Sequence, residues 1–426
     1  MTNAQTTQST NAYQDVLQTV KKLDPKKLAV IKATLPVVAE HGEAITKQFY
    51  RRMFESHPEL KNIFNMTHQI TGHQPKALAD AVYGAAANIE DMSKIMPVLE
   101  RIAEKHRSLQ VKPEHYPIVG QNLLQAIKEV LGDAATDEII DAWADAYAVI
   151  ADVFIRLEDL KYQTAETQPG GWAGYKPFIV DRKVKESEVI TSFYLKPADG
   201  KIASFTPGQF ITIKMESEPY TQLRQYSLSD RPGLDYYRIS VKREDALEEG
   251  YPAGVVSNML HKHVKEGDTV QITAPAGDFY LDLKSTSPVV LLCGGVGLTP
   301  LMSMLNTLVA EQPERNVTYI SAALNGKVHA FNDHIQKVTA DHSQVKSYVV
   351  YQSPTDEDKA ARNYDKEGYI TLDWLKEIVS DKNADFYFCG PTPFMKAIYK
   401  ALKQWGVSPD RIHYEFFGSF GDIESE

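Results

Sequence analysis

His106, Tyr116 and Glu158 are polar residues in segments that otherwise have the apolar spacing of helices. Glu158 lies four residues after Phe154, at the end of an apolar stripe, so its carboxylate should point inward. A buried carboxylate needs a partner, and an imidazole held by a carboxylate is a more basic metal ligand. These residues predict that His106 binds a haem iron, with Tyr116 and Glu158 behind it. The alternatives are a surface or core histidine and a Glu158 in solvent at the helix end.

Other polar residues lie in the helical segments that precede His106. The side chains of Tyr50 and Gln74 could each hydrogen-bond a gas on the open face of the haem, and Phe64 could pack against the porphyrin edge. Taken alone, Tyr50 would be interpreted as an ordinary core tyrosine. In combination, these residues predict a reducible haem that binds a gas.

A second group of motifs, later in the chain, has the residue types of a flavin site. In RQYS, the arginine could hold a flavin phosphate, the tyrosine could cover the isoalloxazine, and the serine could reach a ring nitrogen. PGQF precedes this motif, and GVVSN follows it with the pattern of a helix start whose amides could bind pyrophosphate. A plain strand and a plain helix cap are the alternatives, but the order of the motifs favours FAD. The candidate FAD residues here are Gln209, Phe210, Arg224, Gln225, Tyr226, Ser227, Gly254, Val255, Val256 and Ser257.

Two glycine-containing turns predict a nicotinamide dinucleotide site. GGVGLTP follows an apolar run and opens a helix, which is the context that a phosphate-binding loop requires. CGP ends a second apolar run in the same way. A lone GGVG would indicate no more than a tight strand-to-helix turn. The candidate residues are Gly294, Gly295, Val296, Gly297, Leu298, Thr299, Pro300, Cys389, Gly390 and Pro391.

The predicted secondary structure that positions these motifs differs between three parts of the chain. Helical periodicity fills residues 25–162, and QTAETQPGGWAG at 163–174 has the composition of a linker. Short strands separated by glycine and proline predict a small antiparallel β-barrel over 172–283. One of them, 237–242, alternates apolar and polar residues as a half-buried strand should. Strands and helices alternate over 284–426, which predicts a parallel α/β sheet.

Composition narrows the classes of partner and location. A net charge of −10 over 426 residues argues against nucleic acid as a partner. The longest apolar stretch, 288–305, is broken by glycine and proline, so stable membrane insertion is not expected. Residues 1–24 lack the basic start and apolar core of a secretory signal and predict a polar, mobile tail. With only Cys293 and Cys389 there is no disulfide framework, which fits the cytoplasm.

The long segments FYRRMFESHPELKNIFNM and NIEDMSKIMPVLERIAEKHRSLQVKPEHYPIVG, together with the later motifs, resemble the flavohaemoglobins from about residue 25 to residue 420. The resemblance implies an all-α globin domain with haem b, an antiparallel β-barrel that binds FAD, and an α/β domain of ferredoxin reductase type that binds NAD(P)H. It also assigns residues by position. His106 matches the proximal iron ligand, Tyr116 and Glu158 its hydrogen-bonding partners, and Lys105 a lysine between haem and flavin. The distal pocket and haem-packing positions match Tyr50, Gln74, Leu78 and Phe64, and the C-terminal flavin segment matches Glu415, Phe416, Phe417, Gly418 and Ser419.

For function, the resemblance implies a nitric oxide dioxygenase in which NAD(P)H reduces FAD, FAD reduces the haem, and nitric oxide and dioxygen become nitrate. A peroxide or lipid hydroperoxide reductase is one alternative, and an oxygen-binding protein or gas sensor is another. The complete reductase argues against a sensor, which needs no continuous supply of hydride. A monomer is expected, and a lipid in the distal pocket is left open. The choice between NADH and NADPH is also open, although Lys327 could pair with a 2′-phosphate.

Two features depart from the family pattern. The C-terminal flavin segment ends in Gly-Ser where Gly-Pro is commoner, and residues 244–252 are acidic where many relatives have glycine. The second departure predicts an altered loop near the adenosine end of the flavin. The N-terminal tail is also longer than the family leads one to expect.

Overall fold

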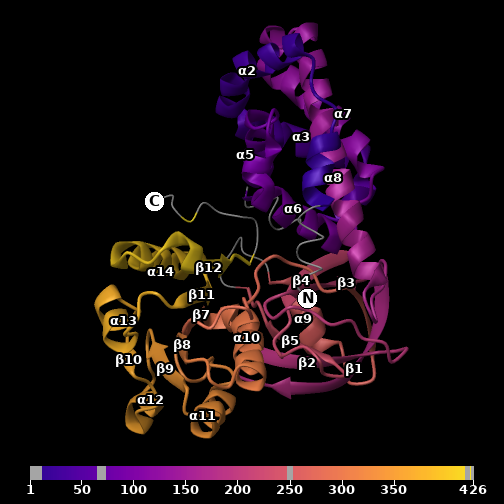
Figure 1. Cartoon of the computed structure of the whole chain (residues 1–426). Helices are drawn as coiled ribbons and strands as arrows, with labels where there is room; N and C mark the ends of the chain where they lie inside the picture. The colour runs from indigo at the N-terminus through magenta and orange to yellow at the C-terminus, as the bar shows by residue number, and fades with distance from the viewer. Residues whose placement is uncertain (1–11, 65–72, 247–252, 418–422, 424–426) are drawn as a thin grey trace. The chain divides into compact units, whose positions relative to one another are not determined.

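The computed structural model describes residues 12–64, 73–246, 253–417 and 423, with the side chains of 73–75 excepted (Figure 1). The chain divides into two compact units, residues 1–167 with 216–223 and residues 168–215 with 224–426. Each unit has apolar clusters of its own.

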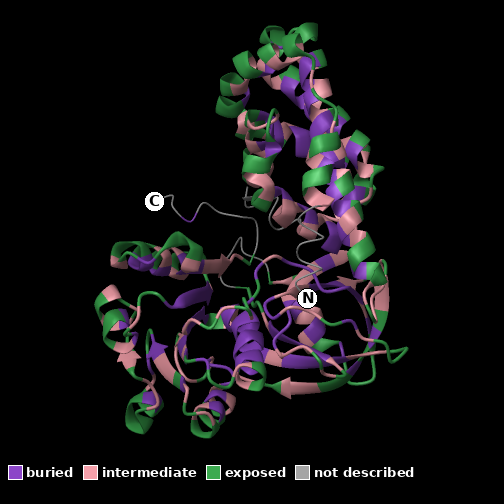
Figure 2. Cartoon of the chain, viewed as in Figure 1, coloured by how far each residue is buried: buried purple, intermediate pink, exposed green. Residues whose placement is uncertain are grey.

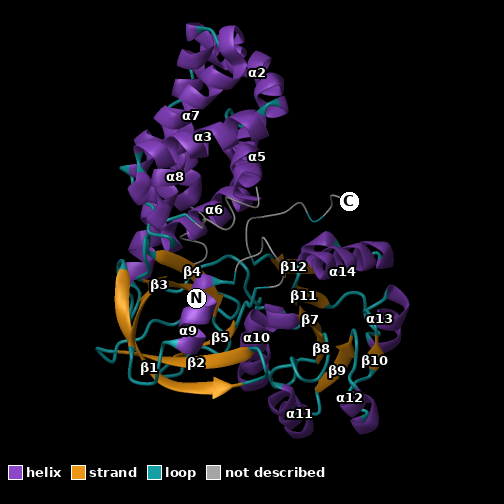
Figure 3. Cartoon of the chain, turned by 180° about the vertical axis from the view of Figure 1, so that it is seen from behind, coloured by secondary structure: helices purple, strands orange, loops and turns teal. Residues whose placement is uncertain are grey.

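Residues 12–167 form helices and, where the structure describes them, no strand (Figure 3). Asp24 starts the first long helix by accepting a hydrogen bond from the Lys26 amide, with Pro25 in the first turn. Gly132, with φ of +56°, ends a later helix. The helices are α2 (Pro25–Glu40), α3 (Gly42–Ser56), η1 (Pro58–Asn62), α5 (His73–Ala87), η2 (Met92–Ile95), α6 (Met96–Ser108), α7 (His115–Leu131), η3 (Gly132–Ala134) and α8 (Asp137–Thr167).

Two predicted boundaries in this part are wrong. Helix α8 continues to Thr167, so the predicted linker is wrong over 163–167. The cause is local, because the hydroxyls of Thr164 and Thr167 donate to carbonyls one turn earlier and Ala165 is buried. The predicted mobile tail is wrong over 12–19, which are helical and bury Val16.

A six-stranded antiparallel sheet carries the predicted flavin motifs. Its strand order is β4-β3-β6-β1-β2-β5, and Leu228, next to the end of β4, pairs with Ile239 of β5, which closes the sheet into a barrel as predicted. Side chains on the inner face form one apolar cluster. The strands are β1 (Tyr175–Lys185), β2 (Ile190–Pro197), β3 (Phe210–Met215), β4 (Gln222–Ser227), β5 (Tyr237–Lys242) and β6 (Thr269–Thr273), with helix α9 (Val255–Lys262) following β5.

The prediction that β5 is half-buried is wrong. Every residue from Tyr237 to Val241 is buried, including Arg238 and Ser240. Arg238 is an ion-pair partner of Asp230 at 3.3 Å and donates to the Ser229 carbonyl. The polar side of the alternation therefore faces other parts of the protein and not water.

The last part of the chain is a parallel sheet with helices on both faces. Alternate residues of β7 (Val289–Gly294) contribute to two different apolar clusters. One cluster includes residues of α10 (Leu298–Glu311) and α11 (Asn332–Asp341), and the other includes residues of α13 (Leu372–Ile378) and α14 (Thr392–Trp405). Helix α10 is buried from Leu298 to Leu308 (Figure 2). The strand order is β10-β9-β8-β7-β11-β12. The elements are β7 (Val289–Gly294), η4 (Gly295–Gly297), α10 (Leu298–Glu311), β8 (Val317–Ala323), α11 (Asn332–Asp341), β9 (Val345–Tyr351), α12 (Asp356–Ala361), β10 (Lys366–Glu367), α13 (Leu372–Ile378), β11 (Asp385–Cys389), α14 (Thr392–Trp405), η5 (Pro409–Arg411) and β12 (Ile412–Glu415).

This order has a topological switch point. Strands β8, β9 and β10 lie on one side of β7, and β11 and β12 lie on the other. In open parallel sheets, dinucleotides bind where the order reverses, outside the carboxyl ends of the strands. The ends of β7 and β11 are therefore where a nicotinamide site is expected. Among the described helices, none has both the length and the apolar character of a membrane span.

Candidate functional site

Three helices bring His106, Tyr116 and Glu158 together. His106 lies in the last turn of α6, Tyr116 in the first turn of α7, and Glu158 in the second half of α8. Nδ1 of His106 is 2.7 Å from Oε1 of Glu158 and 3.2 Å from the Tyr116 hydroxyl, which donates to the same carboxylate oxygen. Glu158 is 2% exposed, so its side chain points inward as the helical spacing predicted.

The electrostatics of this group determine which atom of His106 can bind a metal. Burial, with the charge of Glu158 adding to it, raises the pKa of Tyr116 far above its usual range, so the phenol stays a neutral donor. A carboxylate only accepts hydrogen bonds, so Nδ1 of His106 must carry a proton. Nε2 then keeps its lone pair, and among the described residues no group bonds to it. The group therefore presents Nε2 as a ligand.

Tyr147 and Gly120 fix the position of Tyr116, and the sequence reasoning did not identify this role for either. The Tyr147 hydroxyl of α8 donates to the backbone carbonyl of Tyr116 at 2.7 Å. A Cβ atom at Gly120 would lie 2.3 Å from the Tyr147 ring, so this helical position requires glycine. The only available signal was a glycine inside a helical pattern, which lowers helix propensity without a local reason.

Of the predicted residues of the opposite side, Tyr50 lies in α3, Phe64 lies just after η1, and Gln74 and Leu78 lie in α5. Tyr50 is 6% exposed and its ring lies 5.8 Å from Phe54 and 5.7 Å from Phe64. Leu78 packs against the same apolar cluster. Gln74 lies within α5, but its side chain is outside the described residues. These residues, apart from Gln74, belong to one continuous apolar surface.

The predicted flavin residues of the barrel lie on β4 and in the turn before β3. Arg224 to Ser227 form the end of β4. Burial lowers the pKa of Arg224 and raises the pKa of Tyr226. Gln209 donates through Nε2 to the Gly277 carbonyl at 3.3 Å, and a Cβ at Gly208 would lie 2.3 Å from the Phe279 carbonyl oxygen. The PGQF turn is thus packed against residues 277–279.

Helix α9 begins where the sequence predicted a pyrophosphate-binding helix start. Gly254 is its N-cap, and the amides of Val255, Val256 and Ser257 form the first turn. The first amides of a helix have no acceptor within the helix and favour an anion. The absence of a side chain at Gly254 also leaves room for the Ser257 hydroxyl, because a Cβ at Gly254 would lie 2.7 Å from Oγ of Ser257.

The two glycine turns of the parallel sheet touch each other at the switch point. A Cβ at Gly297 would lie 2.2 Å from the carbonyl oxygen of Cys389, and one at Gly390 would lie 3.1 Å from the backbone of Gly294. Thr299 closes the turn by donating to the Val296 carbonyl at 3.1 Å. The two backbone turns therefore pack directly against each other, with the Phe394 ring beside Gly294 and Gly390, at the place where a dinucleotide is expected.

The C-terminal residues of the predicted flavin segment follow this turn on the neighbouring strand. Glu415 pairs in register with Cys389, and Phe417 is 47% exposed. Burial, with the Glu415 charge adding to it, raises the pKa of the Cys389 thiol well above its usual range. The thiol is thus a neutral, buried group. Gly418 and Ser419 lie outside the described residues, as does most of the acidic stretch 244–252.

Three family models match successive parts of the chain: Globin over residues 47–154, the oxidoreductase FAD-binding domain over 177–280, and the oxidoreductase NAD-binding domain over 291–400. A flavohaemoprotein of Halalkalibacterium halodurans is 53% identical over 93% of this chain and 97% of its own length. One of Oceanobacillus iheyensis is 55% identical over 94% of this chain and 98% of its own length. The chain belongs to the flavohaemoglobin family.

Solved structures agree with this membership. A flavohaemoglobin of Malassezia yamatoensis, determined with bound FAD and haem, aligns with a TM-score of 0.80 at 27% identity, over 93% of this chain and all of its own. The FAD/NAD-binding domain of a nitric oxide dioxygenase from Vibrio cholerae aligns with a TM-score of 0.52 at 39% identity, over 57% of this chain and 98% of its own. The fold of a flavohaemoglobin is therefore present from the helices to the α/β domain.

The helical unit of this flavohaemoglobin has the chemistry that a haem requires. The His106 side chain is 33% exposed although the Phe154 ring lies 5.8 Å away in a buried apolar cluster. Within the described residues, no group of three or more His, Cys, Asp or Glu side chains could hold a bare metal ion. A single imidazole suits an iron whose other ligands come from a porphyrin. The apolar clusters that contain Tyr50 and Phe154 supply side chains that suit the macrocycle itself.

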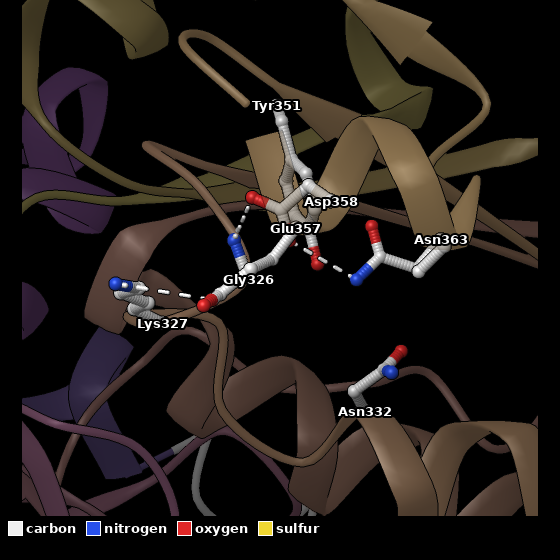
Figure 4. Close-up of a pocket in the computed structure, with 8 residues that line it drawn as sticks. Gly326, Lys327, Asn332, Tyr351, Glu357, Asp358 and Asn363 are labelled. Carbon is white, nitrogen blue, oxygen red and sulfur yellow. Dashed lines mark hydrogen bonds and ion pairs between the residues drawn. The ribbon is translucent and has the colours of Figure 1, made fainter. Parts of the chain in front are cut away.

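A cavity of about 320 Å³ lies beyond the carboxyl ends of β8 and β9 (Figure 4). Lys327 is at its rim and is an ion-pair partner of Glu357 at 3.8 Å. The Asp358 carboxylate accepts from the Gly326 amide at 3.1 Å and from Asn363 at 3.1 Å. Burial works against ionisation of Asp358, but these and other hydrogen bonds prevail and lower its pKa to about 2. The cavity therefore has a permanent negative charge, which the sequence reasoning on Lys327 did not anticipate.

Proposed function

We propose that this chain is an NAD(P)H-dependent nitric oxide dioxygenase with haem b and FAD, which converts nitric oxide and dioxygen to nitrate. The observation that carries the proposal is the hydrogen-bonded His106–Tyr116–Glu158 group in a chain that also has a flavin and nicotinamide reductase. We assign residues 25–167 to the haem, 172–283 to FAD and 284–426 to the nicotinamide. The assignment predicts an enzyme in which NAD(P)H reduces the haem again after each turnover.

The cofactors supply hydride transfer, the division of an electron pair into single electrons, and gas binding. The residues of the chain bind and orient them. Nε2 of His106 holds the iron, while Glu158 and Tyr116 keep the Nδ1 proton in place and raise the basicity of the ring. We assign the binding of the gases to Tyr50, Leu78 and Phe64 and, on its match to the family alone, to Gln74; Lys105 lies next to His106 on α6.

The reductase residues act by positioning. The side chain of Arg224 and the amides of Val255 and Val256 hold flavin phosphates, and Tyr226 covers the ring system. The turn at Gly297 would admit the dinucleotide, and Cys389 and Glu415, which pair on neighbouring strands, would lie beside the nicotinamide.

The test uses purified holoprotein with NADH in air. Addition of nitric oxide is expected to yield an equal amount of nitrate and to consume half as much NADH. Nitrate and NADH are measured together, with catalase and superoxide dismutase present to remove free oxygen species. Fast peroxide reduction with little nitrate would instead favour the peroxidase alternative.

Replacement Glu158→Gln is expected to lower nitric oxide consumption by about 10- to 100-fold, because the neutral amide no longer makes the imidazole more basic. The side chain keeps its shape and its burial, so the fold should persist. Stopped-flow consumption of nitric oxide by reduced protein measures the effect. The matched control is Glu138→Gln, an exposed position in the first turn of the same helix. Equal rates in the two variants would contradict the role of Glu158.

We also expect NADH to be preferred over NADPH, because Glu357 and Asp358 place negative charge beside the only described cation of the cavity lining, Lys327 (Figure 4). Glu357→Lys should raise kcat/KM for NADPH relative to NADH by roughly five-fold, the effect of about 1 kcal/mol at an exposed charge. Ferricyanide reduction by the FAD-loaded protein measures both constants. The control is Glu377→Lys on α13, which is exposed and outside the cavity lining. An unchanged ratio would place the adenosine ribose elsewhere.

A further inference from the structure

The segment 12–20 packs on the helices that carry the proximal group. Val16 is 9% exposed and belongs to one apolar cluster with Leu99 and Ala103 of α6 and Leu157 of α8. Tyr13, Leu17 and Val20 pack against this cluster. No family model covers these residues, since the globin match begins at residue 47, and nothing in the proposed function uses them.

A buried polar contact fixes one end of the segment. Nζ of Lys161 donates to the Tyr13 hydroxyl at 3.2 Å and to Glu104 at 3.0 Å, and it lies 4.9 Å from the centre of the Tyr13 ring. Lys161 is 7% exposed. The other carboxylate oxygen of Glu104 accepts from Arg107 at 3.0 Å. Tyr13 is therefore a second acceptor, beside Glu104, for a buried ammonium group that joins α8 to α6.

The other end of the segment has a second contact with α8. Arg156 donates to Oγ1 of Thr19 at 3.1 Å. Residue 13 thus meets residue 161, and residue 19 meets residue 156, so the segment runs antiparallel to α8. It lies along the same stretch of α8 that contains Glu158.

The two connections between α6 and α8 are neighbours. One is Glu104 with Lys161, and the other is His106 with Glu158. The partners are two residues apart on α6 and three residues apart on α8, so the first connection sets the spacing of the helices where the second must form. A change in that spacing alters the Nδ1–carboxylate hydrogen bond directly.

The charges of the first connection persist in the folded state. Burial disfavours the charged form of Lys161, but Glu104 and Tyr13 prevail and raise its pKa. Glu104 accepts hydrogen bonds from both Arg107 and Lys161. A buried pair of this kind depends on having every donor and acceptor satisfied, and Tyr13 supplies one acceptor.

We propose that residues 12–20 are a positioning element of the proximal site: through Tyr13 and Lys161 they hold α6 against α8 and so set the His106–Glu158 hydrogen bond. The proposal rests on the proposed function, since it concerns the imidazole that holds the iron. It assigns to the N-terminal extension a role in tuning the iron ligand.

The test is resonance Raman spectroscopy of the reduced, gas-free holoprotein. The iron–imidazole stretching band reports the strength of the Nδ1 hydrogen bond. Tyr13→Leu should move this band to lower frequency and speed the loss of haem to an apoprotein acceptor by roughly three- to ten-fold. Tyr13→Phe keeps the ring over the ammonium group but lacks the oxygen, so it should give a smaller shift in the same direction. Tyr369→Leu, at a residue that is 68% exposed in the other unit, should change neither quantity.

A double variant, Tyr13→Leu with Val16→Ser, removes both the polar and the apolar contact of the segment. Amide hydrogen exchange of residues 12–20 shows whether the segment has been released. A released segment with an unchanged band overturns the proposal, and so does an equal shift in Tyr369→Leu. Failure of the proposed function gives a different result. In that case the wild-type protein shows no iron–imidazole band, or shows one that persists in His106→Ala.

Discussion

Replacement of His106 by alanine is expected to abolish nitric oxide consumption while leaving reduction of ferricyanide by NADH intact. His106 is the only member of the proximal group that has a ring nitrogen. Its Nδ1 is held by Glu158 at 2.7 Å, so Nε2 is the atom that can bind iron. The reductase motifs lie in the other compact unit, so hydride transfer to the flavin does not depend on this side chain. The variant therefore separates the two halves of the reaction.

The loss also leaves the Glu158 carboxylate buried with Tyr116 as its remaining partner in the group, which should cost about 1–3 kcal/mol of stability in the helical unit. Visible absorption after haem reconstitution and thermal unfolding measure the two effects. The matched control is His41→Ala, an exposed histidine after α2 whose side chain makes no cap hydrogen bond. Added imidazole should restore part of the haem binding in His106→Gly. A variant with normal haem content and normal nitrate yield would refute the assignment.

Replacement Gly297→Ala is expected to impair the nicotinamide site selectively. The new Cβ would lie 2.2 Å from the carbonyl oxygen and 2.4 Å from the carbonyl carbon of Cys389, and backbone atoms cannot rotate away as a side chain can. The end of β11 must shift, at a cost of about 1–3 kcal/mol. Since about 1.4 kcal/mol corresponds to ten-fold, kcat/KM for NADH should fall by roughly five- to 150-fold if the full cost falls on dinucleotide binding.

Haem absorption and chemical reduction of the flavin by dithionite should remain normal in Gly297→Ala. Steady-state ferricyanide reduction at varied NADH measures the loss. Gly84→Ala in α5 is the control, because a Cβ there meets nothing within 4 Å. Unchanged kinetics in Gly297→Ala would mean that the turns after β7 and β11 do not bind the dinucleotide.

The sequence predicted best the elements whose pattern is set by their own residues. The strand predicted over 237–242 has the bounds of β5, because apolar and polar residues alternate along this run. The inward orientation of Glu158 followed from its position on one stripe of a long helix. In both cases the spacing of apolar and polar residues within the element itself is enough to predict the structural feature.

The sequence failed where burial depends on distant parts of the chain. In β5, Arg238 is buried because it forms an ion pair with Asp230 and donates a hydrogen bond to Oγ of Ser229. Nothing in the sequence around Lys161 indicates burial, yet this residue of α8 is buried and contacts Glu104 and Tyr13, which is far from it in sequence. Ion pairs between residues far apart in sequence leave no periodic signal.

The buried tyrosines have a consequence for behaviour in alkali. Burial raises the pKa of Tyr116, Tyr147 and Tyr237 above the ordinary value of 10.0. The unfolded chain loses phenolic protons above that value while the native chain keeps them, so each such residue favours unfolding as hydroxide rises. Tyr116 should hence remain a neutral hydrogen-bond donor to Glu158 up to the pH at which the fold itself is lost, so alkali is expected to unfold the helical unit before it ionises this phenol.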